Sequence, residues 1–271
     1  MTPCLSQAVT LSTPFAGDIV GYAGGGCHAV EVWLTKLETH LESHSPESTE
    51  ELLQSHGTKL LAAAFQGGLL LSQGEAREAH FAHFKKRLEL CERFRIPTLV
   101  VVADFHQRLD ATALPRSIVS LTQAAQWADG YGVKLALEFQ GGNTFCSCLD
   151  TAITLVEQCG QPNLGVCLDL FHFYTGPSKS EDLVRLTAAT LAHVQLCDVP
   201  GVPRELMTDA DRVFPGEGDF VTHDLVRHLH AIQYAGAVSL EVLNPVLWEM
   251  KPSQLAELAM TSLKTTLGVG G

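Results

Sequence analysis

Short apolar runs rich in β-branched residues alternate along the chain with longer segments in which apolar residues recur every three or four positions. The short runs are typical of parallel strands buried on both faces, and the longer segments are typical of amphipathic helices. This pattern predicts eight strands, which we place at residues 4–9, 29–33, 60–65, 98–103, 134–139, 164–169, 191–197 and 237–242.

The segments between the strands predict helices. They are residues 16–23, 48–57, 77–94, 117–132, 148–160, 180–190, 222–236 and 252–268. The first of these has the weakest pattern, because the stretch "GYAGGG" consists largely of glycine, a poor helix former. Alternating strands and helices form either a closed (β/α)₈ barrel or a doubly wound open sheet. The count of eight favours the barrel, so we expect an α/β fold made of a single TIM barrel over residues 1–271.

Composition and charge narrow the classes of partner. The formal net charge of −12 argues against nucleic acid, whose binding depends on basic side chains. No apolar run approaches the roughly 20 residues of a membrane helix, and the first residues lack the pattern of a secretory signal. Eight scattered cysteines fit a reducing compartment. We therefore expect a cytoplasmic protein that acts on a small molecule, without nucleic acid or membrane partners, and a homo-oligomer is compatible with the sequence.

Oxygen-bearing side chains end four consecutive predicted strands, the fifth to the eighth. They are Glu138, Asp169, Gln195 and Glu241. In a (β/α)₈ barrel the carboxyl ends of the strands build the active site together, so these side chains are expected at one rim. His193 lies two residues before Gln195 on the same face and one layer deeper, which favours Gln195 as the group at the rim.

These four residues predict a metal site. Three carboxylates crowded together without a cation would repel one another, and some would have to stay protonated. Oxygen donors suit Mn²⁺ or Mg²⁺ best, and Co²⁺ or Zn²⁺ is compatible with the set. A single acid at a strand end is more often a helix cap or a salt-bridge partner. Four such residues in series favour the metal.

Several motifs make the chain resemble a known family. They are "LALEF", "LDLFHF", "TDADRVFPGEGDF", "VSLEV" followed by "NP", and "LAMTSLKTT". With them the sequence resembles the xylose isomerase-like TIM barrels, the superfamily of sugar isomerases and epimerases that also includes the AP endonucleases of family 2. Within it, the chain looks most like the inosose (2-keto-myo-inositol) isomerases. The resemblance places metal ligands at Glu138, Asp169, residue 195 and Glu241. Residue 195 departs from the pattern, because the nearest relatives carry histidine there. Glutamine occurs at this position in hydroxypyruvate isomerases and in some dehydroshikimate dehydratases.

The resemblance also implies an activity. It predicts a metal-dependent isomerase or epimerase that converts a ketose or keto-inositol through a metal-stabilised enediolate. Glu138 and Glu241 would be both ligands and acid/base groups, and His172 and Arg212 would bind the substrate. The runner-up is a dehydratase of the inosose or 3-dehydroshikimate type that uses the same metal site. An abasic-site endonuclease fits poorly with the carboxylate-rich rim, and a barrel that binds sugar without catalysis remains a further alternative.

Some residues keep two interpretations at this point. His172 could instead cap the loop after its strand, and Arg212 could instead pin its own loop to Asp209 or Asp211. Glu31 and Trp33 lie two apart on one strand and share a face. They could line the pocket together, or Trp33 could pack in the core beside a solvated Glu31.

Overall fold

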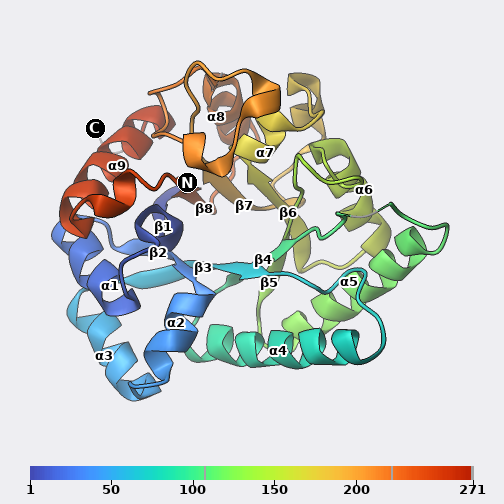
Figure 1. Cartoon of the computed structure of the whole chain (residues 1–271), viewed down its shortest axis with the longest axis horizontal. Helices are drawn as coiled ribbons and strands as arrows, with labels where there is room; N and C mark the ends of the chain where they lie inside the picture. The colour runs from blue at the N-terminus through green and yellow to red at the C-terminus, as the bar shows by residue number, and fades with distance from the viewer. Residues whose placement is uncertain (107, 221, 270–271) are drawn as a thin grey trace. The chain divides into compact units, whose positions relative to one another are not determined.

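A computed structural model describes residues 1–106, 108–220 and 222–269. Within these ranges, eight parallel strands form a closed barrel in sequence order, as Figure 1 shows. This confirms the predicted (β/α)₈ fold. The strands are β1 (Thr2–Ser6), β2 (Ala29–Trp33), β3 (Lys59–Gln66), β4 (Thr98–Val102), β5 (Lys134–Glu138), β6 (Leu164–Asp169), β7 (Leu191–Leu196) and β8 (Ala237–Leu240).

Seven of the eight predicted helical segments contain a helix, and two further helices follow strands directly. They are α1 (Phe15–Gly24), α2 (Leu34–Leu41), α3 (Pro46–Ser55), α4 (Gly74–Arg93), α5 (Ala113–Asp129), α6 (Leu149–Cys159), α7 (Leu170–Thr175), α8 (Thr222–Ala231) and α9 (Pro252–Leu267). The two further helices are α2 and α7. Within the described ranges, each helix is too short or too polar to cross a membrane.

The helix predicted over residues 180–190 is wrong. A 3₁₀ helix covers Ser180–Arg185, and the chain then turns into β7. The Oγ1 atoms of Thr187 and Thr190 accept hydrogen bonds from each other's backbone N–H, at 3.2 and 2.9 Å. Threonine hydroxyls that bond to nearby backbone groups in this way compete with helix formation.

Contacts group the chain into two compact units. Unit 1 comprises residues 1–62, 195–227 and 235–271, and unit 2 comprises residues 63–194 and 228–234. In unit 2, β4, β5 and β6 pair in parallel register, and α5 and α6 pack against each other and against these strands. A buried cluster takes one small side chain from each of four strands: Val100, Ala136, Cys167 and Ala192.

In unit 1, helices α1 and α9 pack closely side by side (Figure 1). A Cβ atom on Gly21 would collide with Pro252, and one on Gly25 would collide with the backbone of Ser253. The glycines that weaken the helical pattern of α1 are therefore the residues that allow this contact.

A buried ion pair joins α1 to α2 in unit 1. Lys36 Nζ lies 2.7 Å from Asp18 Oδ2 and also donates to the carbonyl of Thr10 at 2.7 Å. The hydroxyl of Thr10 donates to Asp18 Oδ1 at 2.7 Å. Burial raises the pKa of Asp18 from its ordinary 3.8 to about 6, although Lys36 and Thr10 act in the opposite direction.

This raised pKa predicts a pH-dependent stability. From about pH 4 to about pH 6, the folded chain holds more protons at Asp18 than the unfolded chain does, so the free energy of unfolding falls as pH rises. A shift of roughly two pKa units corresponds to about 3 kcal/mol. We expect this fall to be absent from Asp18→Asn, because an amide does not titrate.

Denaturant unfolding of both proteins from pH 4 to pH 7 measures the effect. The slope with pH is the readout, since the substitution also removes the ion pair with Lys36. A difference in stability that stays constant over this range would contradict the prediction.

Candidate metal centre

Two carboxylates and an imidazole meet where β5 and β6 end, in unit 2. Glu138 is the last residue of β5, Asp169 is the last residue of β6, and His172 lies in α7, which follows β6 directly (Figure 1). His172 Nε2 is 3.5 Å from Glu138 Oε1 and 3.9 Å from Asp169 Oδ2. One ligand atom from each of the three side chains lies within 4.8 Å of the others, and all three residues are buried. This arrangement has the size and the donor types of a metal site.

Asp169 also determines the local fold. Its Oδ1 accepts hydrogen bonds from the backbone N–H of Phe171 at 2.6 Å and of His172 at 3.4 Å. The aspartate is therefore the N-cap of α7, and the cap brings the His172 ring beside the carboxylates. Asp169 is thus both a helix cap, which is the simpler interpretation of an acid at a strand end, and a member of the cluster.

A small apolar layer supports this cluster. Ala136 and Cys167 lie two residues before Glu138 and Asp169 respectively, so each pair shares one face of its strand. Both small residues belong to the buried cluster of unit 2. The carboxylates therefore lie one layer above packed side chains, and the strands hold them at defined heights.

The other two predicted ligands belong to unit 1, where each has a buried polar neighbour. Gln195 Nε2 donates to Glu31 Oε1 at 2.8 Å. Ser6 Oγ donates to Glu241 Oε1 at 3.4 Å. Glu31 is fully buried, so the interpretation of this residue as a solvated acid is wrong. The hydrogen bond from Gln195, which is 164 residues away in the sequence, provides a polar partner for this buried carboxylate.

Arg212 is the largest fully buried side chain among the described residues and contacts two carboxylates. Its Nε and Nη2 donate to Asp209 Oδ1 at 2.9 and 2.7 Å, and its Nη1 lies 3.5 Å from Glu241 Oε2. The loop-pinning contact to Asp209 is therefore present. The second contact places the guanidinium beside a predicted ligand.

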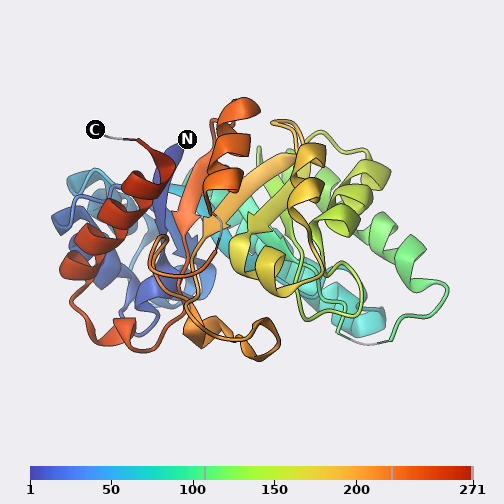
Figure 2. The same cartoon turned by 90° about the horizontal axis from the view of Figure 1, so that it is seen from above.

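A single carboxylate organises the loop that carries Arg212. Figure 2 shows this loop, in orange, extending beyond the tip of β7. Asp198 accepts hydrogen bonds from the backbone N–H of Val199 at 2.9 Å, of Phe220 at 2.8 Å and of Gly216 at 3.0 Å. A Cβ atom on Gly218 would collide with Asp198 Oδ1. Asp198 was not among the residues predicted from the sequence, although the glycines of "PGEGD" are typical of a tight turn in the loop after β7.

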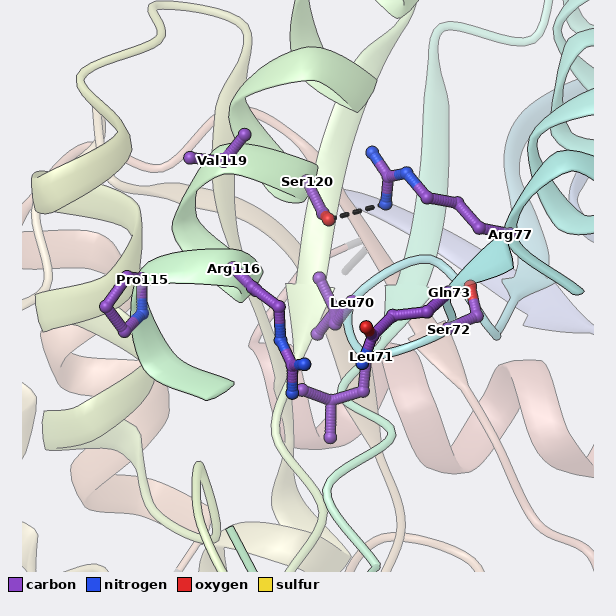
Figure 3. Close-up of a pocket in the computed structure, with 9 residues that line it drawn as sticks. All are labelled: Leu70, Leu71, Ser72, Gln73, Arg77, Pro115, Arg116, Val119 and Ser120. Carbon is purple, nitrogen blue, oxygen red and sulfur yellow. Dashed lines mark hydrogen bonds between the residues drawn. The ribbon is translucent and has the colours of Figure 1, made fainter. Parts of the chain in front are cut away.

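Each of the two units carries a pocket lined by described residues. The pocket of unit 2 has a volume of about 350 Å³ and lies between the first turns of α4 and α5 (Figure 3). Its Arg77 donates to Ser120 Oγ at 2.6 Å and to Gln123 Oε1 at 2.7 Å, so this cation joins the two helices. The pocket of unit 1, about 610 Å³, includes Trp33 in its lining. The residues predicted as ligands and substrate contacts line neither pocket.

The donor set fits a divalent cation. Unit 2 offers two buried carboxylates and an imidazole, and unit 1 offers a buried amide and a buried carboxylate. Mg²⁺ and Mn²⁺ prefer the oxygen donors, and Co²⁺ and Zn²⁺ also bind imidazole well. Glu138, Asp169 and His172 are the described residues whose ligand atoms lie close enough together to hold one ion.

Comparisons with known proteins point to one family. The family model described as "Xylose isomerase-like TIM barrel" matches residues 23–266. An inosose isomerase from Halalkalibacterium halodurans is 29% identical over 279 residues, which covers 98% of this chain and 95% of that protein. An inosose isomerase from Bacillus subtilis is 32% identical over 196 residues, 69% of this chain and 67% of that protein. The crystal structure of the IOLI protein with a bound zinc atom has a TM-score of 0.92 and 25% identity, covering 99% of this chain and 98% of that one.

Proposed function

Because the chain belongs to the xylose isomerase-like TIM barrel family, we propose that it is a divalent-metal-dependent isomerase or epimerase of a ketose or keto-inositol. The observation that carries this proposal is the buried cluster of Glu138, Asp169 and His172 at the ends of two adjacent strands. Similarity to inosose isomerases supports the substrate class, and the zinc in the similar IOLI protein supports metal dependence.

The proposed ligands are Glu138, Asp169, Gln195 and Glu241. They end β5 and β6, lie within β7 and follow β8, and these four strands are consecutive in the barrel. This strand order supports one shared site, because the carboxyl ends of parallel barrel strands meet at one rim. The carboxylate-rich set favours Mn²⁺ or Mg²⁺, while the zinc of the IOLI protein keeps Zn²⁺ as a candidate.

Two glutamates of this chain would carry out the two steps of the proton transfer. A bound divalent ion would supply a Lewis acid that acidifies the carbon next to the substrate carbonyl. Glu138 or Glu241 would remove the proton from that carbon, and the other carboxylate would return a proton to the neighbouring carbon or to the other face. His172 Nε2, 3.5 Å from Glu138 Oε1, would hydrogen-bond a substrate oxygen.

Solvent-deuterium exchange tests the proposal. The purified protein, with Mn²⁺ or with a chelator, is incubated in D₂O with ketoses and keto-inositols, and NMR detects the deuterium. We expect metal-dependent exchange at a carbon next to the carbonyl. Glu138→Gln is the matched variant, because it keeps an oxygen ligand but cannot accept the proton, and it should lose exchange. Metal-loaded protein that exchanges no proton on any of these substrates would contradict the proposal.

The products of the same incubation separate the activities that these residues could support. An isomer or epimer has the mass of the substrate, apart from deuterium. A dehydratase would expel a hydroxyl one carbon further on and give a product with a new double bond and one water less. Exchange accompanied by that product would assign the dehydratase activity in place of the isomerase.

A further inference from the structure

We infer that Glu31 is a positioning residue that fixes the orientation of the Gln195 side-chain amide, and with it the atom that Gln195 presents to a metal. The inference rests on the proposed function in one respect, since it takes Gln195 as a ligand. It goes beyond that function by assigning a role to a residue outside the proposed ligand set.

The chemistry of the contact determines which way the amide points. Gln195 Nε2 lies 2.8 Å from Glu31 Oε1, and both residues are almost completely buried, with 1% and 0% of their surface exposed. The NH₂ group of the amide therefore faces the carboxylate, whose oxygen accepts the hydrogen bond. A flipped amide would place two oxygens against each other. Glu31 therefore directs Nε2 toward β2 and turns Oε1 to the opposite side of the amide.

The strand pairing explains why Glu31 can hold this position. Glu31 lies in β2 directly beside Ser6 of β1 in parallel register. Ser6 Oγ contacts Glu241 at 3.4 Å, and Glu31 contacts Gln195. The β1–β2 pair thus supplies one buried polar partner to each predicted ligand of unit 1. Val30 and Val32, on either side of Glu31, are fully buried on the other face of β2 and anchor the strand.

A carboxylate partner also improves the ligand. A hydrogen bond from the amide N–H to a negative acceptor draws electron density toward the carbonyl oxygen, which makes Oε1 a stronger donor to a hard cation. Metal ligands are commonly held by such outer partners, and removing one typically weakens metal binding about 10- to 100-fold. A histidine at residue 195 could use the same partner, because a neutral imidazole that donates one N–H presents its other nitrogen as a ligand.

A double-mutant cycle on Mn²⁺ affinity tests the inference without substrate. The metal-free wild type, Glu31→Leu, Gln195→Ala and the double variant are titrated with Mn²⁺ by calorimetry. We expect Glu31→Leu to weaken binding 10- to 100-fold. The double variant should bind no more weakly than Gln195→Ala alone, since Glu31 acts through Gln195. Glu31→Gln should restore part of the affinity, because its carbonyl oxygen can still accept from Gln195.

Controls separate this role from a general loss of structure. Thermal unfolding of the metal-free variants checks that each one folds. Asp18→Asn removes another buried carboxylate of unit 1 that has its own ion pair, and it should leave Mn²⁺ affinity unchanged.

Two outcomes would overturn the inference, and they are distinguishable from failure of the proposed function. Wild-type affinity in a folded Glu31→Leu, or an equal loss in the presence and absence of Gln195, overturns the positioning role while the metal-dependent function stands. A wild type that binds no divalent metal overturns the proposed function, and the inference with it.

Discussion

Asp169→Asn is expected to keep the fold and to lose the metal together with the activity. The asparagine Oδ1 can accept from the N–H groups of Phe171 and His172 as the aspartate does, and the two residues are equally good N-caps. The free energy of unfolding should therefore change by no more than about 1 kcal/mol. The substitution nevertheless removes one of the buried negative charges that would bind the cation.

We expect kcat/KM to fall about a thousandfold or more, which corresponds to roughly 4 kcal/mol of transition-state stabilisation. Calorimetric Mn²⁺ titration should show the loss of metal binding directly, and circular dichroism should show the intact fold. Asp182→Asn is the matched control, since Asp182 also accepts from a backbone N–H in unit 2 but is half-buried and does not belong to the cluster. Full metal binding by Asp169→Asn would show that this residue is a cap only.

Arg212→Met is expected to be the most destabilising substitution among the candidate site residues. It removes a buried cation that lies 3.5 Å from Glu241 and 2.7 Å from Asp209. Removing one partner of a buried ion pair typically costs about 3–5 kcal/mol, because the remaining carboxylate is left buried without a compensating charge. Arg212→Lys should recover part of this loss, since a lysine ammonium keeps the charge without the planar fork.

The same variants decide between the two roles of Arg212. If Arg212 only holds its loop, the loss of kcat/KM should follow the loss of stability. If Arg212 contacts the substrate, the folded Arg212→Lys variant should show a raised KM. Denaturant unfolding and steady-state kinetics measure the two effects. Asp209→Asn is the control for the loop contact, because the side chain of Asp209 is 53% exposed and such pairs contribute about 0–1 kcal/mol. An Arg212→Met protein as stable as the wild type would contradict the buried ion pair.

The sequence predicts the positions of the strands more accurately than it predicts which side chains contact one another. The bounds of β2 and β6 agree with the predicted ranges, because buried parallel strands leave a continuous apolar run between turn signals. Asp169 could be recognised as unusual for the same reason, since it interrupts such a run at its end. Local hydrogen bonding explains the helix wrongly predicted over residues 180–190, and close packing explains the glycines of α1.

The partners of the predicted ligands could not be found in this way. Glu31 and Gln195 are 164 residues apart, and no local pattern relates them. Glu31 was indistinguishable from a solvated acid, because an isolated acid between two valines fits an inward or an outward position equally well. In the closed strand order only β1 and β8 separate β2 from β7, so the contact between Glu31 and Gln195 depends on closure of the barrel and not on a local pattern.

The loop after β7 offers a route to altered selectivity by directed evolution. Asp198 and Val213 exchange two backbone hydrogen bonds, at 2.8 and 2.9 Å, so the segment between them begins and ends at neighbouring points. The carboxylate of Asp198 also accepts from the backbone N–H of Val199, Gly216 and Phe220, so backbone groups and one carboxylate hold the two ends of the loop. Doubling the length of a flexible loop costs only about 0.6 kcal/mol. A library that randomises or lengthens residues 200–207, with Asp198, Arg212 and Gly218 kept, would therefore explore new ligands on an unchanged barrel.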